Sequence, residues 1–308
     1  MQLEFVVIHT SLQRGGERTG IIAQPFQRFG REAVKTAQKI VGFPNTSLKR
    51  GENEVTLVNK KLRKDEPLIL AIETATRAGS VAVASGGEVV ASRVGNASVS
   101  HSTNLIEMIK SVLNEAHAEL SDIDLFATAV GPGSFTGLRI GLATVKAFAA
   151  VTGGQIVGVS TLAAIAHAEH KRGEIVSLLP AGRGEVFAQM FSVDDGIVNP
   201  LDRAAHLSPK EVAEKYSDRP GVSFAGEGKS QLNYPFATAS GSVPSGSVLA
   251  EDKSAMCLAV SVAGLALKEY REGKAVTPDE LHAVYVRASD AEINERWQQQ
   301  KAQARVQN

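Results

Sequence analysis

The chain has 308 residues, which is enough for one large domain or two medium-sized domains with hydrophobic cores. Its 33 basic and 33 acidic residues cancel, so no overall field draws it to nucleic acid or to an anionic membrane. The single cysteine excludes an internal disulfide and a cysteine-based zinc site. The longest uncharged window, 147–168, contains three glycines and predicts a helix end, a strand and a helix rather than a membrane span. With no export signal expected at the start, we predict a cytoplasmic protein.

Changes in composition divide the chain into four parts. Residues 1–66 carry twelve basic and seven acidic side chains with weak periodicity, and we expect an appended basic segment that is flexible or lies upstream of the true start. Residues 67–172 predict a first lobe, 173–290 a second and smaller lobe, and 291–308 a polar tail.

The first lobe opens with three predicted strands at 68–74, 80–85 and 88–94, the last two joined by a Gly-Gly hairpin signal. A helix at 102–119 follows, and residues 127–150 then read as strand, glycine turn and helix. The order βββαβα indicates an α/β fold. By analogy it is typical of a ribonuclease-H-like lobe, the unit from which the actin, Hsp70 and sugar-kinase superfamily is built.

A fifth strand at 155–160 and a helix at 161–170 complete the first lobe. The second half predicts a shorter echo of this pattern, with strands at 175–179, 185–192, 196–199, 222–225 and 281–287 and helices at 208–216 and 252–272. Gly273 is the expected end of the last helix, which is free to pack either in the second lobe or back on the first.

The turn between the strand and the helix of 127–150 is the strongest local motif. Glycines and a proline turn the backbone, and the hydroxyls of Ser134 and Thr136 are placed to accept hydrogen bonds from a helix that begins near Gly137. Such a turn suits an anion, and the predicted nucleotide or anion site comprises Glu73, Gly131, Gly133, Ser134, Thr136 and Gly137. Glu73 ends the first strand, where it could bind Mg²⁺. No second carboxylate accompanies it, so a structural role is favoured.

Other catalytic signals are weak. His101 has no histidine four positions later, and His167 and His170 lie near a helix end that reads as a solvated face, so no metal site is expected. Residues 226–230 imitate the end of a phosphate-binding P-loop, but Ser223 stands where that pattern requires glycine.

Two helices carry surfaces that point to a partner. The helix 102–119 has an apolar stripe broader than one sheet needs, which a deep position in its own core would explain equally well. The helix after the turn has a stripe of small residues that lets another backbone come close, and this favours an interface. The predicted partner interface comprises Leu105, Ile106, Met108, Ile109, Leu113, Gly137, Gly141 and Thr144. On this hypothesis Gly141→Glu abolishes pairing and leaves the fold intact.

Three motifs are similar to those of a known family. They are Ala71–Thr76 (AIETAT), His101–Leu105 (HSTNL) and above all the eleven residues Gly131–Gly141 (GPGSFTGLRIG). They resemble the TsaB family of the bacterial tRNA threonylcarbamoyladenosine machinery, over about residues 68–287.

The resemblance implies a non-catalytic scaffold that pairs with a TsaD-type catalytic subunit. A TsaE-type ATPase joins them, and the complex transfers a threonylcarbamoyl group to the adenosine beside the anticodon. The resemblance therefore implies that this chain contacts tRNA as part of the complex. The metal-binding histidines belong to TsaD. No cofactor is firmly implied, although ATP or ADP is compatible with the complex interface.

The chain departs from the family pattern at two places. The family often has Asp where this chain has Glu73, and an Asp-Ala-Arg run where this chain has Pro180–Arg183, with Arg183 as the nearest substitute. Two alternatives stay open: an autonomous glycoprotease-like metallopeptidase or ATPase, and a homodimer through the same helices when TsaD is absent.

Overall fold

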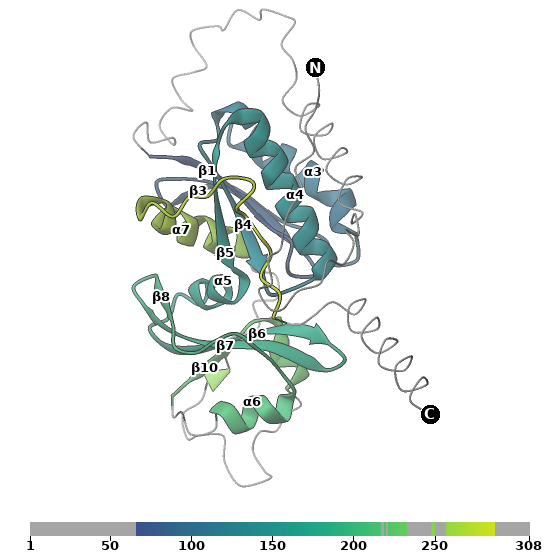
Figure 1. Ribbon diagram of the computed structural model, residues 1–308, viewed down its shortest axis with the longest axis vertical. Helices are drawn as coiled ribbons and strands as arrows, with labels where there is room; N and C mark the ends of the chain where they lie inside the picture. The colour runs from purple at the N-terminus through teal and green to yellow at the C-terminus, as the bar shows by residue number, and fades with distance from the viewer. Residues whose placement is uncertain (1–65, 217–218, 220, 233–247, 250–256, 287–308) are drawn as a thin grey trace, which may run out of the picture.

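The computed structural model describes residues 66–216, 219, 221–232, 248–249 and 257–286. The predicted basic segment, apart from Glu66, and the predicted polar tail lie outside these residues. Two sheets lie one above the other along the long axis of the molecule, with helix α5 between them (Figure 1).

The first sheet has five strands in the order β3-β2-β1-β4-β5. Their bounds are β1 Leu68–Glu73, β2 Ser80–Ser85, β3 Glu88–Val94, β4 Leu125–Gly131 and β5 Gln155–Ser160. The hairpins β1–β2 and β2–β3 are antiparallel, whereas β4 pairs in parallel with both β1 and β5. Strands β1 and β2 are buried along their whole length, which explains their almost continuous apolar sequence. The predicted order βββαβα is confirmed.

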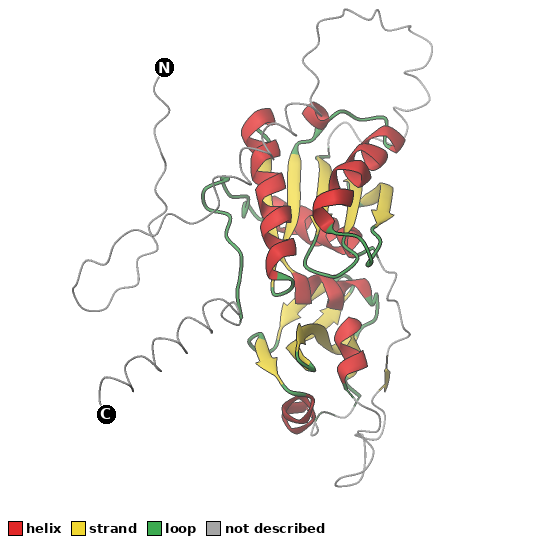
Figure 2. Ribbon diagram, turned by 90° about the vertical axis from the view of Figure 1, so that its right-hand side faces the viewer, coloured by secondary structure: helices red, strands yellow, loops and turns green. Residues whose placement is uncertain are grey.

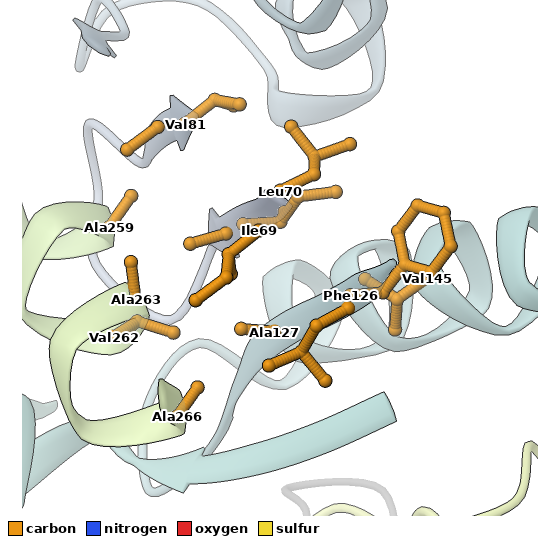
Figure 3. Close-up of a cluster of buried hydrophobic side chains, with 14 of the residues drawn as sticks. Ile69, Leu70, Val81, Phe126, Ala127, Val145, Ala259, Val262, Ala263 and Ala266 are labelled. Carbon is orange, nitrogen blue, oxygen red and sulfur yellow. The ribbon is translucent and has the colours of Figure 1, made fainter. Parts of the chain in front are cut away.

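Helices cover both faces of this sheet (Figure 2). Helices α3 (His101–Glu115) and α4 (Phe135–Thr152) lie on one face, and α7 (Leu258–Arg271) packs on β1, β2, β4 and β5 from the other. Figure 3 shows the alanines of α7, among them Ala259 and Ala263, directed toward Ile69 and Val81. These small side chains let α7 approach the sheet closely. Among the described residues, α4 is long and apolar enough to cross a membrane by length and composition alone, and half of that stretch is buried in the molecule.

The second sheet repeats the strand order and directions of the first. Strands β6 (Gly173–Gly182), β7 (Glu185–Asp194) and β8 (Ile197–Pro200) form an antiparallel meander, and β10 (Ser223–Ala225) and β11 (Val248–Leu249) extend it in parallel beside β6. Strand β9 (Ala205–Leu207) pairs with β7, and α6 spans Pro209–Tyr216.

Helix α5 (Thr161–Ala168) belongs to both halves of the molecule. Ala164 lies in the core of the first sheet, whereas Leu162 and Ile165 lie in the core of the second. Ser160 caps the helix by accepting a hydrogen bond from the Ala163 N–H at 3.4 Å. Because one short helix completes two cores, the halves share a continuous hydrophobic contact.

Two predicted helix ends are wrong. Helix α3 ends at Glu115 rather than 119, because His117 is left-handed (φ 51°) and the Ala118 N–H bonds back to the Leu113 carbonyl at 3.0 Å; the short 3₁₀ turn Leu120–Asp122 follows. Helix α5 stops at Ala168, before the left-handed His170.

The predicted strand 281–287 does not form in its described part, 281–286. This stretch has one backbone hydrogen bond to the sheet, from the Val284 N–H to the Val130 carbonyl at 2.7 Å. The start of the predicted helix 252–272 lies outside the described residues, and Gly273 follows its end with φ 74°, as expected.

Candidate functional site

The glycine turn is built as a helix cap. Ser134 caps α4 by accepting a hydrogen bond from the Gly137 N–H at 3.2 Å, so the helix begins at Phe135, two residues earlier than predicted. Thr136 is the second residue of the helix and therefore not its cap. The Ser134 N–H donates to the Ala75 carbonyl at 2.8 Å, which ties the turn to the loop that follows β1.

The two turn glycines are covered by the chain itself. A Cβ on Gly131 would overlap the Val284 carbonyl, and one on Gly133 would lie 2.6 Å from the Cβ of Ala75. Gly131 also has φ 120°, which side chains rarely adopt. Both glycines permit close packing against other parts of the chain, and neither is among the residues that line the pocket between the sheets described below.

The small-residue stripe of α4 faces the chain's own first sheet. A Cβ on Gly137 would overlap the Thr74 carbonyl, and one on Gly141 would overlap Thr74 Oγ1, which donates to the Gly137 carbonyl at 2.8 Å. Thr144 is buried on the same helix and bonds the Ile140 carbonyl at 2.8 Å. The expectation that Gly137, Gly141 and Thr144 present a face to a partner is therefore wrong. The close approach that the two glycines permit is made by Thr74, the residue that follows β1.

The apolar stripe of α3 divides into two groups. Leu105, Ile109 and Leu113 are buried in the core of the first sheet, which accounts for them without a partner. Ile106 and Met108 are only partly buried and remain accessible on the described surface.

Glu73 is sealed within the fold. Its Oε1 accepts the Thr76 N–H at 2.7 Å, and its Oε2 accepts the hydroxyls of Thr76 at 2.8 Å and Ser80 at 3.4 Å. Ser80 Oγ in turn accepts the Ala259 N–H of α7 at 3.0 Å. Burial raises the pKa of Glu73, and the hydrogen bonds from Thr76 and Ser80 oppose that rise. At 1 % exposure, the carboxyl group braces the loop after β1 against α7.

A pocket of about 700 Å³ opens between the two sheets. Its first-sheet wall comes from three segments: the loop after β1, the residues that lead into α3, and the first turns of α4. Its second-sheet wall comes from the end of β6 and the 3₁₀ turn Glu227–Gln231. The polar lining residues are Thr76, Arg77, Ser98, Ser100, His101, Ser134, Thr136, Glu227, Ser230 and Gln231.

This pocket includes part of the predicted anion site. Ser134, Thr136 and Gly137 line it, whereas Glu73, Gly131 and Gly133 do not. Sequence reasoning missed Arg77, Ser98 and the second-sheet wall because they lie on separate short loops without a local motif. The false P-loop at 226–230 was the one sequence signal for that wall.

The histidines do not gather into a metal centre: among the described residues no three His, Cys, Asp or Glu side chains are placed to share an ion. His167 and His170 approach with ring centroids 5.9 Å apart. His170 is exposed, but His167 is half-buried against Gly264 of α7, so the predicted solvated face is wrong for His167. Burial lowers the pKa of His167, and the neighbouring His170 lowers it further.

Sequence comparison with known proteins agrees with the family resemblance that the three motifs indicate. Residues 88–301 match the family described as TsaD, tRNA N6-adenosine threonylcarbamoyltransferase. The tRNA threonylcarbamoyladenosine biosynthesis protein TsaB of Escherichia coli K12 is 31 % identical over 223 residues, which are 71 % of this chain and 94 % of that protein. The protein of the same name from Bacillus subtilis 168 is 30 % identical over 161 residues, 51 % of this chain and 70 % of the relative.

Two solved structures share the fold. One is an uncharacterized Pseudomonas aeruginosa protein with similarity to peptidase YeaZ, with 27 % identity, a TM-score of 0.57 and coverage of 72 % of this chain and 100 % of that one. YeaZ from Pseudomonas aeruginosa has a TM-score of 0.59 at 24 % identity, covering 71 % and 99 %. The resemblance carried by the three sequence motifs is thus confirmed, and the chain belongs to the TsaB family.

Proposed function

We propose that this chain is a non-catalytic subunit of tRNA threonylcarbamoyladenosine synthesis. It pairs with a TsaD-type catalytic subunit and supports transfer of the threonylcarbamoyl group to the adenosine next to the anticodon. Membership of the TsaB family supports a part in threonylcarbamoyladenosine synthesis, and the arrangement of the candidate site supports a non-catalytic part.

The observation that carries the non-catalytic role is the state of Glu73. An acid at the end of the first strand could hold Mg²⁺ near a phosphate only if its oxygens faced the pocket. Both oxygens of Glu73 instead accept hydrogen bonds from the chain's own loop and from Ser80. Glu73 therefore has a structural role, and the TsaD-type partner carries out the catalysis.

The accessible part of α3 is the better candidate for the docking surface. Ile106→Glu and Met108→Lys should each reduce co-purification with the TsaD-type subunit, because each places a charge on a partly exposed apolar position at one of the two edges of the buried stripe. Glu107→Ala is the matched control, since the Glu107 side chain is 75 % exposed on the same helix. Thermal unfolding separates lost pairing from lost folding. Undiminished co-purification by both folded variants would remove α3 from the interface.

The pathway is tested in cells. Depletion of the chain should reduce threonylcarbamoyladenosine in digested total tRNA, measured by mass spectrometry, and re-expression should restore it. Unchanged modification after depletion would refute the proposed function.

The remaining expectations belong to the same proposal. A TsaE-type ATPase joins the pair, tRNA is bound through the complex, and the site of action is the cytoplasm. No cofactor is firmly implied, although the complex interface is compatible with ATP or ADP. The repeated strand order of the two sheets supports two ribonuclease-H-like lobes of the actin-like superfamily, divided near residue 172. Light scattering with and without the TsaD-type subunit tests the homodimer. Bound metal or ATP turnover by the isolated chain would favour the autonomous enzyme.

A further inference from the structure

An exposed apolar surface lies where the stretch 281–286 crosses the start of α4. Val284 is 51 % exposed and Tyr285 is 47 % exposed, and the 2.7 Å hydrogen bond from the Val284 N–H to the Val130 carbonyl holds them in place. The ring centroid of Tyr285 lies 5.2 Å from that of the partly buried Phe135. The guanidinium carbon of Arg139 lies 3.7 Å from the same Phe135 centroid. We call Phe135, Arg139, Val284 and Tyr285 the aromatic platform.

The platform is held from two sides. On one side Val284 is bonded to the end of β4, and on the other Val286 packs against the core of the second sheet. Single exposed apolar side chains are ordinary on protein surfaces, but adjacent ones that stack on an aromatic ring favour a contact surface. The chain leads from this surface directly into residues 287–308.

The sequence that follows has the pattern of a short amphipathic helix. Ser289 and Glu292 have the spacing of a capping box, and Glu292 and Arg296 have that of a stabilising ion pair on a helix. Ile293 and Trp297 are also four positions apart, so a helix that begins after Ser289 carries both on one side. Because so short a helix is marginal in water by itself, its two apolar side chains need a surface to pack on.

Reach and charge favour the aromatic platform as that surface. The link from Val286 to Asp290 spans at most about 14 Å, and a helix from Asp290 to Trp297 is about 12 Å long. The apolar pair is therefore confined near Tyr285, which gives it a high local concentration at the platform. Residues 289–298 carry three acidic side chains and one basic side chain, and the platform contributes the positive charge of Arg139.

We propose that residues 289–298 form a helix that packs Ile293 and Trp297 onto the aromatic platform of the same molecule. The segment then covers the exposed sides of Val284 and Tyr285, with its acidic side chains toward Arg139. It is a built-in cover for the first turns of α4, so a partner that binds there has to displace it. The proposal concerns the chain alone and does not depend on the proposed function, which the tRNA measurement tests separately.

The test uses the fluorescence of Trp297, the one tryptophan of the chain. In the purified full-length protein we expect its emission to lie at shorter wavelength, and its quenching by acrylamide to be weaker, than in urea. Tyr285→Ser and Val284→Ser should each raise the undocked fraction about fivefold, as expected for the loss of one apolar contact of ordinary strength. Ile293→Ser should have the same effect from the side of the segment.

Val151→Ser is the matched control, because Val151 is a 40 % exposed valine near the opposite end of α4 and should leave the fluorescence unchanged. Circular dichroism checks the fold of each variant, and if one platform variant does not fold, the other decides. The proposal is overturned by emission and quenching equal to those in urea, or by shielding that both folded platform variants leave intact. Shielding that disappears on dilution would also overturn it, because the segment would then pack on a second copy.

Discussion

Gly141→Ala measures how tightly α4 lies on the first sheet. The added Cβ would overlap Thr74 Oγ1 and lie 3.3 Å from Thr128 Oγ1. Thr74 cannot turn aside without losing its 2.8 Å hydrogen bond to the Gly137 carbonyl, worth about 1 kcal/mol. Overpacking adds about 1–3 kcal/mol, and the better helix propensity of alanine returns about 1 kcal/mol. We therefore expect a net loss of about 1–3 kcal/mol, and Gly141→Glu should prevent folding rather than spare it.

Urea unfolding of the full chain supplies the measurement, and a double-mutant cycle gives it specificity. Thr74→Ala removes the overlapping hydroxyl, so the double variant should be more stable than Gly141→Ala alone, with a coupling of about 1 kcal/mol or more. Ala150→Glu, on the exposed side of the same helix, should change stability by less than about 0.5 kcal/mol. A Gly141→Ala variant as stable as the parent, or strictly additive effects, would refute the overlap.

Three further predictions concern other contacts. Burial lowers the pKa of His167, so this imidazole binds a proton more readily in the unfolded chain than in the folded one. The stability that His167 contributes should be complete above its ordinary pKa of 6.5 and should decrease as the pH falls below that value. His167→Asn should make stability less dependent on pH, as measured by thermal unfolding at pH 5–8. Asp202→Ala should reduce stability by about 2–4 kcal/mol, because the Met190 N–H and the Tyr216 hydroxyl each lose a 2.8 Å hydrogen bond to this carboxylate. Lys210→Ala, which removes an exposed ion pair with Glu214, is the control, and an equal effect of the two variants in urea unfolding would contradict this. Ser80→Ala should lower stability by about 1–3 kcal/mol by leaving the Ala259 N–H unpaired, and equality with the exposed Ser121→Ala in urea unfolding would argue against that role.

Local patterns predicted the elements of the first sheet well. The alternation and glycine turns of 68–94 located β1 to β3, and Ser134 was correctly identified as a capping residue. Strands β9 and β11 were missed because two or three residues carry no periodicity. The end of α3 was missed because its left-handed residue is a histidine, whereas glycine is the usual signal.

Sequence alone could not say what lies against a surface. The stripe Gly137–Gly141–Thr144 correctly indicated a close approach, but the approaching residue is Thr74 of the same chain, just after β1 and 63 residues before Gly137 in sequence. The pocket could be predicted only in part for a related reason. Its walls come from five segments of both sheets, and only the α4 turn has a motif that marks it locally.

The position of α7 affects how the chain matures during synthesis. Strands β1 to β5 are complete by Ser160, yet the helix that covers their second face begins only at Leu258. At about 5–20 residues per second the ribosome needs roughly 5–20 s for the intervening stretch. The nascent first half therefore exposes an apolar sheet face for that time, which makes it a natural client for a ribosome-associated chaperone and leaves any product truncated before Leu258 prone to aggregate.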